Sequence, residues 1–292
     1  MTPTSGQAAS SSRLTASVVA AELARLTPRD RLLLDLLDQH QTFSTEQLVT
    51  LAFGSVGRAR NRLNTLYGRD ILDRFRLFHR PGSQSWRWTL GPVGAAIVAA
   101  GRGDAMPRPA AVRDTTARLA MSPRLNHLLA TNGFFVALTG HARATTEAGS
   151  GVRLARWWNE QRCRDATGNL VRPDGHGVWV TGGRAVPFWL EMDLGTEALQ
   201  RVAGKLTGYA ALGPRRAYPV LFWLPTAARE ANLHALWSRT GIPDGVAIAT
   251  GADDYAAANG GPAGPVWRRP GDPARVTLAD LPGTRDGAAW DA

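Results

Sequence analysis

Apolar residues recur at helical spacing through the first third of the chain. They predict three helices, in residues 29–40, 45–52 and 55–70. Two runs typical of β-strands follow at 71–80 and 83–90, and the Pro81-Gly82 pair between them predicts a turn. Three helices followed by a basic hairpin indicate a winged helix-turn-helix domain, which we place at residues 21–104.

After residue 122 the pattern changes to alternating helices and strands. The expected order is a helix, three strands, a helix, a strand, a helix and a strand. The strands are expected at 154–159, 168–180, 186–194, 218–224 and 246–250, and the helices at 124–143, 197–212 and 226–239. This order suits an α/β domain with a mixed sheet, which we place at residues 122–250. The chain as a whole is therefore expected to be α+β or α/β.

Three further segments lie outside these two domains. Residues 1–20 begin with small polar residues and predict a disordered tail. Residues 105–121 contain prolines but keep some helical pattern, so they are expected to form a linker, either a bridging helix or a flexible tether. Residues 251–292 are rich in glycine and proline and predict an extended C-terminal arm, with Trp267 as an anchor.

The composition favours a polyanionic partner. The chain has 292 residues and a formal net charge of +10, and each contact with a phosphate releases counterions and adds affinity. A basic surface without a specific ligand is the alternative. The apolar runs are far shorter than the roughly 20 residues of a membrane span. The single cysteine, Cys163, excludes an internal disulfide and fits a reducing compartment, so we expect a cytoplasmic protein with no membrane partner.

Arginine is concentrated on the third helix and on the hairpin of the first domain. Arginine and asparagine can make paired hydrogen bonds to guanine and adenine edges, and arginine also binds phosphates. Docking to another protein, or a merely solvated basic face, is the alternative. The candidate DNA-binding residues are Arg58, Arg60, Asn61, Arg62 and Thr65 on the helix, and Arg74, Arg76, Arg80 and Arg87 on the hairpin.

Three acidic residues and the only lysine of the chain lie close together in the sequence of the second domain. Asp174 follows a proline at the start of one strand, and Glu191 and Asp193 alternate onto one face of the next strand, about 7 Å apart. Lys205 lies on the helix that follows. Carboxylates in such a group can hold Mg²⁺ or Mn²⁺. The alternative is that these acids pair with nearby arginines such as Arg172, Arg184 and Arg201.

The Pro-Asp pair, the Glu-x-Asp pair and the order of elements resemble the PD-(D/E)XK nuclease superfamily, whose fold is that of restriction endonucleases. The resemblance implies catalytic, metal-binding roles for Asp174 and Glu191, with Glu160 as a further metal ligand. Asp193 stands where the superfamily has its catalytic lysine. Lys205 and Tyr209 match the spacing of a Q-x-x-x-Y motif in some branches, so Lys205 is expected to supply the missing ammonium group.

Across both domains, the chain resembles the actinobacterial replication-relaxation family, on the strings LTPRDRLLLDLL, RPDG, FWLEMDLGTE and KLTGY. The resemblance implies a role on plasmid or mobile-element DNA. We therefore expect a DNA-binding protein of replication or relaxation that acts as a metal-dependent DNA nickase or endonuclease. The alternative is a non-catalytic accessory or replication factor with a degenerate nuclease fold.

The expected partner is double-stranded DNA. Replication or conjugation proteins and a second copy of the chain, as a homodimer, are left open as further partners. A relaxase with a tyrosine nucleophile is disfavoured, because no two histidines are spaced by one residue as the cation site of such enzymes requires.

Overall fold

The computed structural model describes residues 14–76, 84–146, 151–213 and 216–283. It divides into two compact units. The first comprises residues 1–45 and 55–121, and the second comprises residues 46–54 and 122–292. The mixed α+β character expected from the sequence is confirmed, since the structure combines helices with a seven-stranded mixed sheet. In the described part of the chain, no helix combines the length and apolar character needed to cross a membrane.

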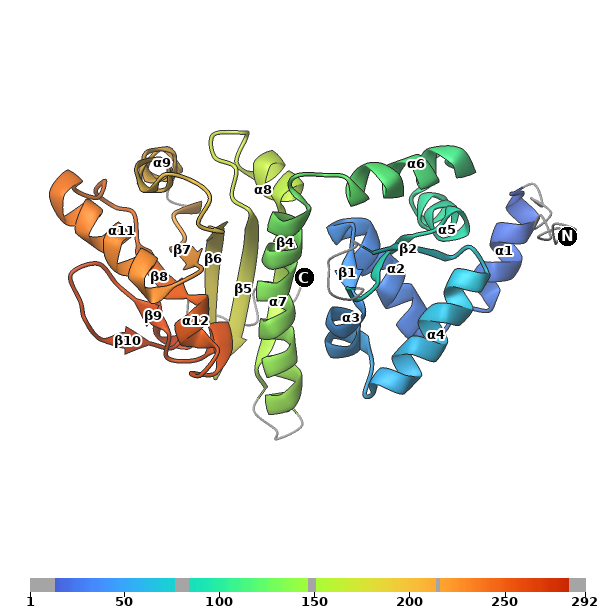
Figure 1. Ribbon diagram of the computed structural model, residues 1–292, viewed down its shortest axis with the longest axis horizontal. Coiled ribbons are helices and arrows are strands. Elements are labelled where there is room, and N and C mark those ends of the chain that lie inside the picture. The colour runs from blue at the N-terminus through green and yellow to red at the C-terminus, as the bar shows by residue number, and fades with distance from the viewer. Residues whose placement is uncertain (1–13, 77–83, 147–150, 214–215, 284–292) are drawn as a thin grey trace, which may run out of the picture. The chain divides into compact units, whose positions relative to one another are not determined.

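The first unit combines helices with a small sheet (Figure 1). Its helices are α1 (Ala16–Ala24), α2 (Pro28–His40), α4 (Val56–Gly68), α5 (Pro92–Arg102) and α6 (Pro109–Ala120). Its strands are β1 (Phe43–Ser44), β2 (Leu72–Phe75) and β3 (Arg87–Leu90). They pair antiparallel in the order β1-β3-β2. A sheet therefore joins the two predicted strands of the hairpin with a short third strand that the sequence pattern did not indicate.

Local capping explains where α2 begins. The Thr27 hydroxyl accepts a hydrogen bond from the Asp30 amide at 3.3 Å, and the Asp30 carboxylate accepts one from the Thr27 amide at 2.8 Å. This reciprocal pair satisfies two amides that a helix start otherwise leaves without partners. One element differs from the expected organisation, because α1 overlaps the predicted tail 1–20, whereas α6 occupies most of the predicted linker 105–121 and corresponds to the helical alternative given for it.

The second unit is built on the seven-stranded sheet, in the order β10-β9-β8-β7-β6-β5-β4. Strands β6, β7 and β8 are parallel, and the other pairings are antiparallel. The strands are β4 (Arg153–Asn159), β5 (Gly175–Thr181), β6 (Arg184–Met192), β7 (Val220–Leu224), β8 (Ile248–Ala252), β9 (Trp267–Arg268) and β10 (Arg275–Val276). The helices are α3 (Thr45–Ala52), which begins one residue before this unit, α7 (Leu125–Thr146), α8 (Glu160–Ala166), α9 (Leu199–Gly204), α10 (Leu206–Ala210), α11 (Ala227–Thr240) and α12 (Asp253–Ala256).

Helices cover both faces of this sheet. Helix α7 packs on one face, where Phe134 and Phe135 meet Phe188 and Leu190. Helices α9, α10 and α11 pack on the other face (Figure 1). The α7 face is tight at Gly177, where a Cβ atom would lie 2.3 Å from the Phe188 ring. The central strands β6 and β7 are thus buried on both sides, which explains their continuous apolar runs.

Part of the predicted C-terminal arm, 251–292, is incorporated in the sheet as β9 and β10. Trp267 of β9 is fully buried, and its indole N–H donates to the carbonyl oxygen of Pro262 at 2.8 Å. Arg275 of β10 forms an ion pair with the buried carboxylate of Glu230 on α11. Burial of a large aromatic ring and a buried ion pair hold these two short strands in place.

Candidate functional site

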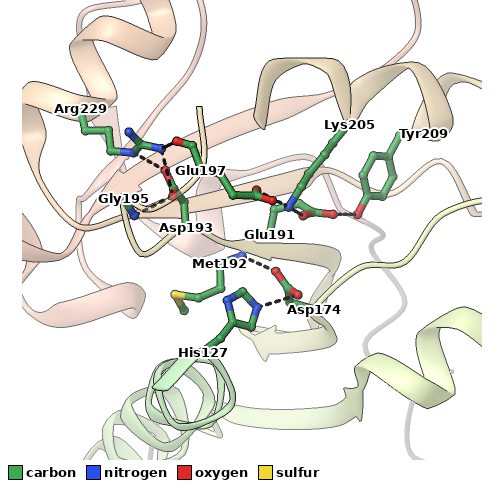
Figure 2. A network of polar contacts seen from close by, with 10 residues as sticks. All are labelled: His127, Asp174, Glu191, Met192, Asp193, Gly195, Glu197, Lys205, Tyr209 and Arg229. Carbon is green, nitrogen blue, oxygen red and sulfur yellow. Dashed lines mark hydrogen bonds and ion pairs between the residues drawn. The ribbon is translucent and has the colours of Figure 1, made fainter. Parts of the chain in front are cut away.

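A network of polar side chains lies at the end of β6 where the chain leaves the sheet, and it includes two of the predicted acids (Figure 2). Asp174 immediately precedes β5, and pairing of Gly175 with Leu190 sets it beside β6. Its amide donates to the Leu190 carbonyl oxygen at 2.9 Å, and its carboxylate accepts from the Met192 amide at 2.8 Å. The backbone of β6 therefore fixes the Asp174 carboxylate next to Glu191.

Glu191 is 4% exposed and binds two side chains from the following helices. The Lys205 ammonium donates to one carboxylate oxygen at 2.7 Å, and the Tyr209 hydroxyl donates to the other at 2.5 Å. Lys205 lies at the break between α9 and α10, within the stretch predicted as one helix, 197–212. Lys205 and Tyr209 are four residues apart, so both side chains point toward Glu191 on β6 (Figure 2).

Burial and mutual charge shift the pKa values of this group. Burial and the nearby Asp174 carboxylate raise the pKa of Glu191 to about 7, although Lys205 and Tyr209 oppose the rise. Burial disfavours charge on Lys205, but the carboxylates of Glu191 and Asp174 outweigh it, so the pKa of Lys205 rises. Burial, with Glu191 next, raises the pKa of Tyr209. Lys205 and Tyr209 thus stay protonated donors at neutral pH.

The shift at Glu191 predicts a pH dependence of stability. Because its pKa rises from 4.5 to about 7 on folding, the folded state binds more protons than the unfolded state between these values. The free energy of unfolding then falls as pH rises through that window. We expect the wild type to lose on the order of 2 kcal/mol between about pH 5 and about pH 8, and Glu191→Gln to lose less. Urea unfolding in EDTA measures this, and equal losses in both proteins would contradict it.

His127 is a member of the network that sequence reasoning missed. Its Nε2 lies 2.8 Å from an Asp174 carboxylate oxygen, and it reaches there from the first turn of α7 (Figure 2). The interaction with Asp174 raises the pKa of His127, although burial opposes the rise. In the sequence His127 is a lone histidine among leucines, a pattern more typical of a structural residue. No local signal indicates that α7 runs past the start of β5.

Asp193 does not join this group. It follows the last residue of β6, and its carboxylate accepts from Arg229 of α11 at 2.5 Å and from the Gly195 amide at 2.8 Å. The expectation that Asp193 and Glu191 serve one site rested on strand alternation, which stops at Met192. Glu197 lies between the Asp193–Arg229 pair and the Glu191–Lys205 pair. Its carbonyl oxygen accepts from Arg229 at 2.6 Å, and its carboxylate lies 3.6 Å from the Lys205 ammonium.

Glu160 is also engaged elsewhere. It begins α8, and its carboxylate accepts from Arg124 at 2.7 Å. Among residues 14–76, 84–146, 151–213 and 216–283, no three or more histidine, cysteine, aspartate or glutamate side chains form a group suited to a metal ion. The donors that do lie together are the carboxylates of Asp174 and Glu191. These two carboxylates are oxygen donors that a hard divalent cation can bind, and the Lys205 ammonium lies beside them.

Comparison with known families identifies the chain. A family model described as replication-relaxation matches residues 34–219, which is more than half of this 292-residue chain. The chain belongs to the replication-relaxation family. No curated protein and no solved structure matched it. The region shared with the replication-relaxation family contains the whole Asp174, Glu191, Lys205 and Tyr209 network and reaches back into α2.

The replication-relaxation match also covers α4, the helix predicted to enter a DNA groove. Arg58, Arg60, Asn61 and Thr65 are exposed on this helix. Arg62 differs, because its guanidinium donates at 2.8 Å to the carboxylate of Asp30, which is fully buried. Four of the five candidates on α4 therefore present their side chains to solvent, and the fifth is held by α2.

The arginines predicted on the hairpin lie against aromatic rings. Arg74 lies over Trp86, with its guanidinium carbon 4.1 Å from the ring centroid, and Arg76 lies over the same ring at 4.2 Å. Arg87 is half-buried on β3, and Arg80 lies outside the described residues. Stacking on Trp86 limits the conformations of two long side chains while leaving their charge available to a phosphate.

Proposed function

We propose that this replication-relaxation protein binds plasmid or mobile-element DNA and nicks or cleaves it at the Asp174-Glu191-Lys205 group. The observation that carries the proposal is the convergence of these three side chains: Lys205 donates to Glu191, and the Met192 amide fixes the Asp174 carboxylate close enough to act on the charge of both. Two acids and a cation so placed are suited to phosphodiester chemistry, in which negative charge develops on a phosphate oxygen. Family membership supports DNA as the substrate.

The folds of the two parts are consistent with this proposal. From α7 to β8 the elements run helix, three strands, helices, strand, helix, strand, with the short helix α8 inserted between the first two strands and acids at the second and third strands. That order supports a PD-(D/E)XK-like domain. Along the chain, the order α2, α3, α4, β2, β3 with the sheet β1-β3-β2 supports a winged helix-turn-helix, in which α3 is the one element that is grouped with the second compact unit. Exposed arginines on α4 fit a helix that enters a groove.

The proposed cofactor is Mg²⁺ or Mn²⁺, held by Asp174 and Glu191. A bound divalent cation would supply an activated water and neutralise charge on the scissile phosphate. Within the protein, Tyr209 and Lys205 hold Glu191 in place from the α9–α10 side, and the Met192 amide holds Asp174. The partly exposed Lys205 ammonium would neutralise charge on the phosphate.

The direct test is incubation of supercoiled plasmid and of single-stranded DNA with the full chain in Mg²⁺, in Mn²⁺ and in EDTA. Open circular product in either metal, and none in EDTA, supports a nickase. Linear product supports an endonuclease that cuts both strands. Covalently closed relaxed product would contradict simple hydrolysis. An unchanged plasmid in both metals would contradict the catalytic proposal.

A second candidate is a non-catalytic factor that uses the same unit to hold DNA or a partner. The contacts of the acids favour it. Asp193, which stands where the nuclease superfamily has its lysine, is bound by Arg229. Glu191 and Asp174 already have cationic neighbours, in Lys205 and His127. DNA retention in the absence of any strand cleavage would assign this function.

DNA binding by α4 gives a separate prediction. Changing both Arg58 and Arg60 to glutamine should weaken duplex binding and reduce the magnitude of the slope of log affinity against log salt by about 1.8, since each lost phosphate contact contributes about 0.9. Fluorescence anisotropy with a labelled duplex over a salt series measures both quantities. The matched control changes Arg31 and Arg118, which are exposed on α2 and α6, to glutamine. An equal effect in the control would indicate a loss of general charge only.

A further inference from the structure

A row of aromatic rings crosses β4, β5 and β6 on the sheet face that carries Glu191. Strand pairing sets Trp158 opposite His176, and His176 opposite Trp189. Paired residues share a face, and Glu191 lies two residues beyond Trp189 on that face. Asp174 precedes His176 by two residues, about 7 Å along the strand. The aromatic row therefore lies directly beside the acidic group.

The rings of this row contact one another closely. The His176 ring centroid lies 4.7 Å from both the Trp158 and the Trp189 centroids, and it stacks on Tyr218 at 5.3 Å. His176 and Trp189 are buried, whereas Trp158 and Tyr218 are half-buried at the surface. Two buried rings thus support two outer rings, which fixes the orientation of the outer pair.

His176 is a neutral hydrogen-bond acceptor within the row. Its Nδ1 lies 2.8 Å from the Phe188 carbonyl oxygen, and a carbonyl can only accept, so Nδ1 carries the proton. Burial lowers the pKa of His176 to about 3, although the bond to Phe188 opposes this. Its Nε2 is buried and has no hydrogen-bond partner in the described part of the chain. His176 therefore contributes an uncharged ring to the row.

Two arginines flank the outer tryptophan. The guanidinium carbon of Arg156 lies 5.0 Å from the Trp158 ring centroid, and that of Arg162 lies 5.2 Å from it. Arg156 comes from β4, the edge strand of the sheet, and Arg162 from the first turn of α8. A half-buried indole with two guanidinium groups near its ring combines a stacking surface with positive charge, which is how proteins bind single-stranded nucleic acids.

We propose that Trp158, Tyr218, Arg156 and Arg162, the Trp158 surface, bind an unpaired DNA strand next to the acidic group. Bases stack on Trp158 and phosphates pair with the two arginines. The strand must be unpaired, because both faces of a base are covered by its neighbours in a duplex. The proposal deepens the proposed function, from which it takes DNA as the partner, but binding at the Trp158 surface does not require cleavage.

The test measures binding of the full chain to a fluorescein-labelled thymidine oligonucleotide of about 12 nucleotides, to an abasic strand of the same length and to a hairpin duplex. EDTA is present throughout, so that failure of catalysis cannot affect the result. Trp158→Leu removes the stacking ring, and Trp158→Phe restores an aromatic face. The double variant Arg156→Gln, Arg162→Gln removes charge at the half-buried Arg156 and the exposed Arg162, and Arg118→Gln, Arg239→Gln at two exposed arginines is its control.

Trp158→Leu is expected to weaken thymidine-strand binding about tenfold, to leave abasic-strand binding unchanged, and to be largely reversed in Trp158→Phe. The double arginine variant should weaken binding of both the thymidine strand and the abasic strand. It should also reduce the magnitude of the slope of log affinity against log salt by about 1.4. Thermal unfolding midpoints separate these losses from misfolding, and the arginine variant decides the outcome if Trp158→Leu does not fold. Unchanged binding in the folded variants overturns the proposal. Equal losses of affinity for the single strand and for the hairpin duplex would indicate that the Trp158 surface binds the duplex backbone, and would also overturn the proposal.

Discussion

Changing Asp174 to asparagine or Glu191 to glutamine is expected to lower the rate of metal-dependent DNA nicking about a hundred- to thousandfold. Each change removes one negative charge from the group that we propose to hold the cation, while nearly preserving side-chain volume. The proposed cation site should be lost rather than weakened, because no group of three or more acidic, histidine or cysteine side chains in the described part of the chain could replace a missing carboxylate. Initial rates of open-circle formation from supercoiled plasmid, over a range of Mg²⁺ and Mn²⁺ concentrations, measure the effect.

The fold should survive both changes. Besides burial, the charge of Asp174 raises the pKa of its neighbour Glu191. Removal of either charge therefore relieves repulsion between the two carboxylates, which offsets the loss of the ion pair with Lys205 or His127. Unfolding midpoints close to that of the wild type would therefore accompany the loss of activity. The matched control is Asp165→Asn, an exposed carboxylate on α8 outside the network, which should nick DNA at the wild-type rate. Nicking that persists in both acid variants would remove the site from the proposal and leave the non-catalytic function.

Asp193 provides an internal comparison. Its carboxylate is bound to Arg229 and to the Gly195 amide rather than to the cation group. Asp193→Asn should therefore lower stability, through loss of an ion pair with a buried carboxylate, while it leaves the dependence of nicking on metal concentration unchanged. A shifted metal dependence in this variant would place Asp193 among the ligands, as the sequence pattern suggested.

Most elements of the fold follow from local patterns in the sequence, because their signals are short-range. Alternation and apolar runs located β4, β6 and β7, and the capping pattern at Thr27 located the start of α2. Helix α8 was not predicted, since its seven residues are too few to show a periodic stripe. Strands β9 and β10 contain two residues each, and they depend on burial of Trp267 and on the pairing of Arg275 with Glu230, which no local pattern encodes.

The site was predictable as far as it depends on residues near each other along the chain. Strand alternation and the four-residue spacing brought Glu191, Lys205 and Tyr209 into consideration together. The structure adds a contact of Tyr209 that the sequence did not indicate, because its ring is buried and its hydroxyl donates to the Glu191 carboxylate. His127 lies 47 positions before Asp174 in the sequence, so only the packing of α7 reveals their contact.

Arg62 is the residue whose role changes most between sequence and structure. On the helical pattern it lies beside Arg58 on the face that was expected to contact a groove. In the structure its guanidinium binds the carboxylate of Asp30, and Asp30 in turn caps α2 through Thr27. The side chain of Asp30 is fully buried, so its charge depends on Arg62 for compensation. The pKa of Asp30 is lowered, because the bonds from Arg62 and Thr27 outweigh the effect of burial.

Changing Arg62 to methionine is therefore expected to lower the free energy of unfolding by about 2–3 kcal/mol, somewhat less than the loss of a fully buried partner, because the bonds from Thr27 remain. Changing Arg58 to methionine should alter it by no more than about 0.5 kcal/mol, since Arg58 is exposed. Urea unfolding measures both, and Asp30→Asn combined with Arg62→Met should recover part of the loss because no charge is left buried.

The same proteins separate the two roles in DNA binding: below its unfolding temperature, Arg62→Met should bind duplex nearly as well as the wild type, whereas Arg58→Met should bind it less tightly. A stable Arg62→Met protein with weakened duplex binding would return Arg62 to the groove and show that its ion pair with Asp30 opens when DNA binds.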